Sequence, residues 1–146
     1  MRDPLWKLLF CAVLVTLPVF AFATVSDSLR ADNARIPDAP PSARMRVAYF
    51  DLHNDGEQAI RIVAIDSADF GRAVMHQTVF ENGVAKMRAL TEVLVPAHGS
   101  FQFAPGAAHV MLSAPTRALG VNDRVRLSLL LASGDRFEVE LPIRAD

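Results

Sequence analysis

The chain has 146 residues, of which 51% are hydrophobic, and its formal net charge is −1 at neutral pH. This length suits one domain with a substantial apolar core. A chain without an excess of basic residues lacks the electrostatic footprint of a nucleic-acid-binding protein, so we expect no nucleic acid partner.

The N-terminal residues have the pattern of a secretory signal peptide. Arg2 and Lys7 flank the start of an apolar run over residues 8–22, which leads into an Ala-Phe-Ala cleavage pattern. The alternative is an uncleaved membrane anchor, but the run is short for a membrane span. We therefore expect residues 1–23 to be removed and residues 24–146 to form one periplasmic domain, with no stable membrane insertion afterwards.

Removal of the signal peptide would also remove Cys11, the only cysteine. A mature chain without thiols has no disulfide and no cysteine nucleophile. It also has no blue-copper site, which needs a Cys ligand. The sequence shows no Ser, His and acid set and no Gly-rich phosphate loop. We therefore expect that the protein is not an enzyme.

The mature chain has short apolar and alternating segments separated by turn signals. Strands are expected over residues 28–36, 44–52, 59–65, 74–80, 84–90, 93–95, 100–103, 109–112, 124–131 and 137–143. The first is expected to be an edge strand. Asp55-Gly56 is expected to join the second and third strands as a hairpin, because Asp-Gly favours tight two-residue turns. Short strands with frequent turns predict an all-β sandwich or barrel.

A second hairpin, with Asn82-Gly83 as its two turn residues, makes a prediction about register. This turn places Thr78 directly opposite Met87 on the partner strand. His76 then lies on the same face as Met87, as a diagonal neighbour roughly 7 Å away at the backbone. A slip of one residue would put the two side chains on opposite faces.

Two His and two Met residues of the mature chain are separated by two long intervals in the sequence. His76 is followed by ten residues and Met87, and then by twenty-one residues and His109-Val110-Met111. Taken singly, a Met in a strand usually fills the core. Jointly, these soft and borderline donors suit Cu(I) better than zinc, calcium or magnesium. We expect His76, Met87, His109 and Met111 to bind one Cu(I).

This spacing resembles the metal motif of the PCu(A)C family of periplasmic copper chaperones. The flanking segments 47–54, 81–84 and 105–112 are also similar to that family, and the likeness extends over residues 34–143. Many members carry a further Met two residues after the first His, where this chain has Thr78. The departure leaves any accessory Met ligand in doubt.

The resemblance implies a cupredoxin-like Greek-key β-sandwich. It also implies delivery of Cu(I) for assembly of the dinuclear copper centre of cytochrome c oxidase. The receiving partner would be the copper subunit itself or a thiol-bearing assembly factor. We further expect a monomer.

Two other interpretations stay open at this point. One is copper buffering or resistance without a dedicated receiver. The other is an extracellular β-sandwich that binds no metal, in which case the four predicted ligands should be scattered. Met45 and Met75 are expected to be packing residues, with Met75 the first to test as a substitute for the Met missing at position 78. His53 and His98 are expected to be solvated in turns.

Overall fold

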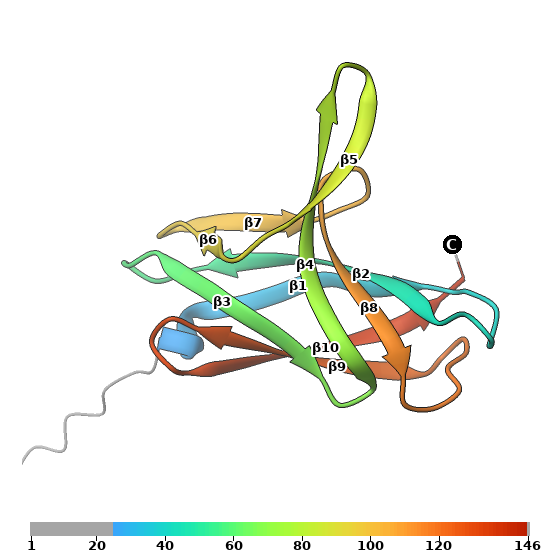
Figure 1. Cartoon of the computed structure of the whole chain (residues 1–146). Helices are drawn as coiled ribbons and strands as arrows, with labels where there is room; N and C mark the ends of the chain where they lie inside the picture. Colours follow the sequence, from blue (N-terminus) through green and yellow to red (C-terminus); the bar gives the residue numbers. More distant parts are fainter. Residues whose placement is uncertain (1–24, 146) are drawn as a thin grey trace, which may run out of the picture.

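The computed structural model describes residues 25–145, and apart from one short 3-10 helix all regular structure in this part of the chain is β-strand. The signal-peptide prediction for residues 1–23 lies outside the described residues. The predicted all-β class is confirmed (Figure 1). The elements are η1 (Val25–Ser28), β1 (Leu29–Pro37), β2 (Met45–Asn54), β3 (Ile60–Ser67), β4 (Phe70–Glu81), β5 (Val84–Ala89), β6 (Val93–Val95), β7 (Gly99–Phe103), β8 (Ala108–Pro115), β9 (Arg124–Leu131) and β10 (Arg136–Arg144).

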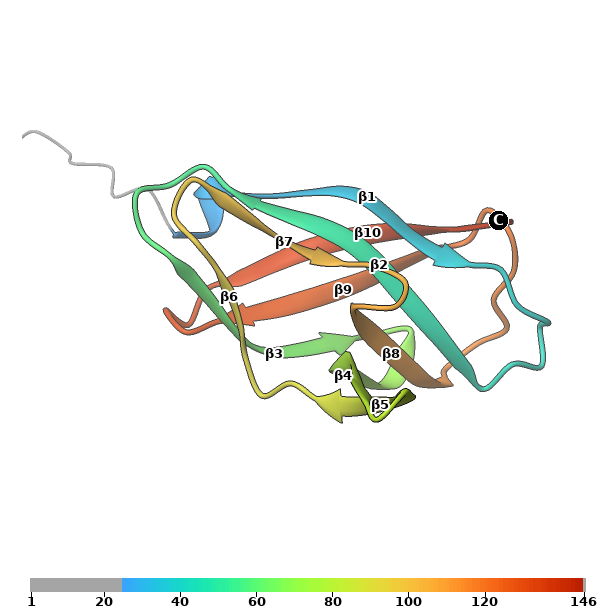
Figure 2. The ribbon, with the colours of Figure 1, turned by 90° about the horizontal axis from the view of Figure 1, so that it is seen from above.

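The strands are hydrogen-bonded in one continuous order that folds over into two packed layers (Figure 2). One layer has the order β5-β4-β8-β7-β2-β1, and the other has the order β10-β9-β3-β6. β1 joins them, because it pairs antiparallel with β2 and then, through Ile36, parallel with β10. Successive strands such as β2 and β3 therefore lie in different layers. The predicted cupredoxin-like sandwich is confirmed.

The prediction that the first strand is an edge strand is wrong. β1 lies between β2 and β10 in the strand order. An irregularity between Asp32 and Arg35, with Asn33 at φ 52°, lets β1 leave one partner for the other. Ile36 beyond it is fully buried. The polar residues of this segment belong to its outer face and to its bulge.

The predicted hairpin at Asp55-Gly56 is also wrong. β2 pairs with β1, β7 and β8, whereas β3 pairs with β6 and β9. The turn instead carries the chain from one layer to the other. The buried Asn54 amide organises it by donating to the carbonyls of Gln58 and Pro96, at 2.7 and 3.0 Å, while its oxygen accepts from the Gly56 N–H. Gly56 is required by close approach, since an added Cβ would lie 2.9 Å from the Ser28 hydroxyl.

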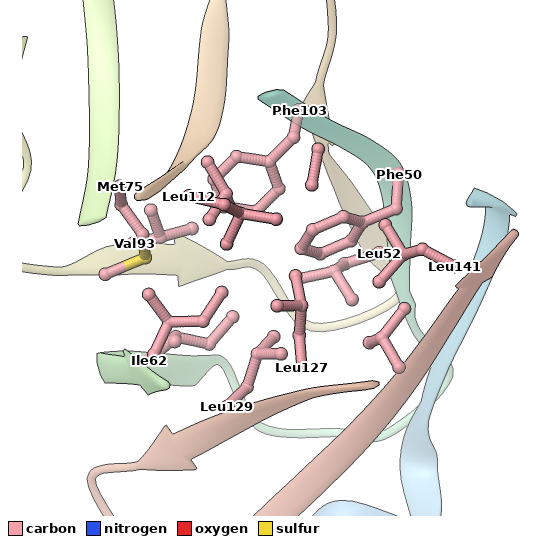
Figure 3. Close-up of a cluster of buried hydrophobic side chains, with 14 of the residues drawn as sticks. Phe50, Leu52, Ile62, Met75, Val93, Phe103, Leu112, Leu127, Leu129 and Leu141 are labelled. Atoms are coloured by element: carbon pink, nitrogen blue, oxygen red, sulfur yellow. The ribbon is translucent and has the colours of Figure 1, made fainter. Parts of the chain in front are cut away.

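The core lies between the two layers and is almost entirely aliphatic and aromatic (Figure 3). Phe50 and Phe103 from one layer contact each other with ring centroids 4.6 Å apart. Leu127, Leu129 and Leu141 face them from the other layer and are fully buried. Burial of these side chains supplies most of the driving force for folding. It also fixes which face of β4 and β8 is left for function.

The hairpin of β4 and β5 extends beyond the sandwich as an arm (Figure 1). β4 pairs with β8 only as far as Gln77, and further along it pairs with β5 alone. The turn residues Asn82 and Gly83 have φ values of 53° and 76°, as a tight two-residue turn requires. Thr78 is paired with Met87. The predicted register of this hairpin is confirmed.

Candidate metal centre

Two neighbouring strands bring the two predicted His ligands together. Along β4, Met75 points into the core with 3% exposure, so His76 faces outward. Along β8, Val110 and Leu112 are fully buried, so His109 and Met111 face outward on the same side. The antiparallel register pairs His76 directly with His109. Because buried apolar residues alternate with them along β4 and β8, the predicted ligands His76, His109 and Met111 share the outer face of these strands.

The two imidazole rings lie against each other. Their centroids are 5.8 Å apart and their planes are inclined by 22°. His76 is half-buried, and His109 has only 5% of its surface exposed.

Each ring leaves one nitrogen without a hydrogen bond. His76 Nδ1 and His109 Nε2 are buried and have no hydrogen-bond partner within the part of the chain that the structure describes. The other nitrogen of His109, Nδ1, lies 3.2 Å from the carbonyl oxygen of Ala107. Because a carbonyl only accepts, Nδ1 carries the proton in this hydrogen bond, and the Nε2 lone pair is free. Metal-binding imidazoles are commonly oriented in this way.

Burial lowers the pKa of His76 below its ordinary value. The nearby His109 lowers this pKa further and Arg72 contributes in the same direction, while an interaction with the Val74 backbone acts the opposite way and does not cancel the effect. The folded protein therefore favours the neutral form of the His76 imidazole. A neutral ring is the form that binds a metal ion.

Met111 extends the site along β8. It is paired with Val74 on one side and Val47 on the other. Together with His76 it lines a shallow surface depression of about 230 Å³. The full lining is Met45, Arg72, Val74, His76, Met111 and Ser113. Two of these residues, His76 and Met111, are predicted ligands.

Met87 lies on the arm rather than in the depression. It is paired with Thr78 and is thus the diagonal neighbour of His76 on the same face. Its side chain is 61% exposed, and Phe80 beside Thr78 on β4 is 71% exposed. All six residues of β5 are exposed. The thioether of Met87 is therefore free to move towards or away from the two imidazoles.

The other Met and His residues lie partly where the sequence predicted them and partly elsewhere. Met75 is a core residue facing away from His76, so the idea that it could substitute for the Met missing at position 78 is wrong. His98 is exposed in a turn as expected, 3.2 Å from Glu57. His53 lies in β2 rather than in a turn, with its side chain one-third exposed and 3.5 Å from Asp32.

Met45 was missed by the sequence analysis, which placed it among the packing residues. It is 55% exposed at the start of β2 and lines the depression with Met111. The sequence did contain a signal, because Asp51 and His53 lie an even number of residues after Met45 and therefore face the same side of the strand. Phe50 and Leu52 have the opposite parity. The polar residues thus mark the outer face of β2.

The donors at this site are soft or borderline. The depression and the arm contribute two imidazoles and thioethers, and the residues described as lining the depression include no carboxylate. No three His, Cys, Asp or Glu side chains gather into a metal site anywhere in residues 25–145. Such a donor set fits a soft monovalent ion better than zinc or calcium.

Comparison with known proteins identifies the family. The family model described as "Putative lipoprotein LpqE-like" matches residues 29–143, which include the whole sandwich. The chain belongs to the LpqE-like family. A relative, "Putative lipoprotein Lxx21020" of Leifsonia xyli subsp. xyli, is 24% identical over 135 residues, which cover 92% of this chain and 80% of the relative.

Solved structures share the fold of this LpqE-like protein. The apo PCuAC domain from PmoF1 matches with a TM-score of 0.66 and 22% identity, covering 82% of this chain and 95% of that domain. The solution structure of CuI-DR1885 from Deinococcus radiodurans matches with a TM-score of 0.61 and 26% identity, covering 77% of this chain and 76% of that one. The predicted likeness to PCu(A)C proteins is confirmed at the level of the fold. Within residues 25–145, no helix is long and apolar enough to cross a bilayer.

Proposed function

We propose that this LpqE-like protein is a periplasmic carrier that binds one Cu(I) through His76, Met87, His109 and Met111 and passes it to a receiving protein. The observation that carries the proposal is the pair of buried imidazole nitrogens, one on His76 and one on His109, that have no partner among the described residues. A buried polar atom without a partner is costly, so it points to a ligand. The Cu(I) form of DR1885, a structure of the same fold, supports copper as that ligand.

The chemistry of the donors suits a carrier. Imidazole and thioether are neutral, so binding Cu(I) needs no deprotonation of a thiol and leaves the ion with its full charge. A receiver with thiolate ligands can therefore remove the ion. His109 is held by the Ala107 carbonyl, whereas Met87 is on an exposed strand. We infer that the imidazoles retain the ion while Met87 exchanges with the ligands of a receiver.

An anaerobic Cu(I) competition titration of residues 24–146 against a coloured chelator tests binding. The wild type should bind one equivalent, and the His109→Ala/Met111→Ala double variant should lose it. A matched control, His53→Ala/Met75→Leu, removes one His and one Met that lie away from the site and should bind as the wild type does. Absence of binding by the wild type, or equal loss in the control, would contradict the proposal.

Delivery needs a separate test, because buffering would give the same titration. We infer that the receiver is the copper subunit of cytochrome c oxidase or a thiol-bearing assembly factor for it. Deletion of the gene should then lower oxidase activity when copper is limiting, and added copper should restore the activity. Oxidase activity that is unchanged at every copper concentration would favour buffering over delivery.

A further inference from the structure

Met45 lies on the same outer face as Met111. The register of β2 against β8 pairs Met45 with Ser113 and Val47 with Met111. Met45 is thus the diagonal neighbour of Met111, and backbones in this relation are roughly 7–8 Å apart. Two long side chains extending from such positions can reach a single ion between them, because each Met has three rotatable bonds.

The surface between these two residues is open. Met45, Met111 and His76 line the same depression. Ser113, the residue between Met45 and Arg72 across the three strands, is small and lines this depression as well. An exposed Met that served only to cover the core would be packed against its neighbours, but 55% of Met45 is exposed to solvent.

The electrostatics differ between the two ends of the depression. The end near His76 and His109 has unpaired imidazole nitrogens that attract a cation. The guanidinium of Arg72 repels a cation, and it belongs to the end near Met45, where both residues are paired with Ser113, although its field also reaches His76. A Cu(I) ion held by thioethers beside Arg72 is therefore held more weakly than one held by the imidazoles.

We propose that Met45 is a further Cu(I) ligand of this site. In this inference, which rests on the proposed function, Met45 and Met111 hold the ion at the outer end of the depression, and the ion leaves the protein from there. Movement to this end exchanges a Cu–N bond to His76 for a Cu–S bond to Met45. Both donors are neutral lone pairs, so copper stays Cu(I) and no proton or electron is transferred. Met111 remains bound throughout.

The test is a titration of residues 24–146, labelled with ¹³C at the methionine methyl groups, with Cu(I) under anaerobic conditions. The labelled residues are Met45, Met75, Met87 and Met111. We expect the methyl resonances of Met45, Met87 and Met111 to shift during the first equivalent while that of the buried Met75 stays in place. Shifts of Met87 and Met111 without Met45 would overturn this inference and leave the proposed function intact. No shift in any methyl group would overturn both.

The rate of Cu(I) release distinguishes a Met45 that binds the ion from a Met45 that only lies near it. Met45→Leu keeps the size and apolar character of the side chain but removes the sulfur. We expect this variant to release Cu(I) to an excess of a thiol chelator more slowly than the wild type, with its copper stoichiometry unchanged. Met75→Leu is the matched control and should release copper at the wild-type rate. Equal release rates in Met45→Leu and the wild type would contradict an exit position at Met45.

Discussion

Replacement of His109 by Phe should stabilise the protein without copper while abolishing copper binding. The wild-type ring leaves Nε2 buried without a hydrogen-bond partner in the described chain, and removing such an atom recovers about 1–3 kcal/mol. The change also removes the bond from Nδ1 to the Ala107 carbonyl, which contributes about 0.5–1.5 kcal/mol. That carbonyl keeps a partner, since it also accepts from the Thr78 N–H at 3.2 Å. The net expectation is a gain of about 1 kcal/mol.

The assay is urea and thermal unfolding of residues 24–146 at neutral pH with a copper chelator present. A gain of about 1 kcal/mol corresponds to a rise of roughly 4 °C in Tm for a domain of this size. Copper at a hundredfold excess over its Kd should then stabilise the wild type by about 2.7 kcal/mol. The same addition should leave the variant unchanged.

The partly exposed His53 provides the control. His53→Phe alters a ring beside Asp32 on the surface and should change the stability by no more than about 0.5 kcal/mol. If His109→Phe lowered the stability without copper by more than about 1 kcal/mol, the Nε2 atom must have a partner in the folded protein. The reasoning that links this imidazole to a metal ion would then be refuted.

Three further predictions concern the charge, the arm and the turn after β2. The pKa of His76 is lowered in the folded protein, so below about pH 6.5 the unfolded chain binds more protons than the folded one. The stability of the copper-free protein should therefore fall as the pH drops below this value, until the pH passes the folded-state pKa. His76→Gln should flatten this part of the pH–stability curve. Gly83→Ala, at φ 76°, should destabilise the arm by about 1 kcal/mol, measured as faster amide hydrogen exchange in β5 with little change in Tm. Asn54→Ala should lower the free energy of unfolding in urea by about 2–3 kcal/mol, and Asn54→Asp should not restore it, because a carboxylate cannot donate to the Gln58 and Pro96 carbonyls.

Local interactions explain why parts of the site were predictable. The register of β4 against β5 depends on a two-residue turn, so Asn82-Gly83 alone fixed Thr78 opposite Met87. The strand predicted over residues 124–131 is likewise confirmed as β9, in which Val125, Leu127 and Leu129 are buried. In both cases residues close in sequence determine which side of a strand faces the core.

The pairing of strands that are distant in the chain could not be predicted from the sequence. Asp55-Gly56 suggested a hairpin, but the interactions of Asn54 with Pro96 take the chain across to the other layer. The alternation along β2 places Met45 on the outer face with Asp51 and His53, but nothing near it in sequence showed which strand would lie beside β2. Its pairing with β8 leaves it exposed next to Met111.

The sequence by itself determined the all-β class, the hairpin register that places Met87 opposite Thr78, and the chemical softness of the donor set, because these depend on composition, alternation and a short turn. Only the tertiary structure decided that His76 would stack on His109, that one nitrogen of each ring would be buried without a partner, and that Met45 would join Met111 at the surface. The pairing of β4 and β2 with β8 sets these contacts. That pairing depends on how the whole core packs between the two layers.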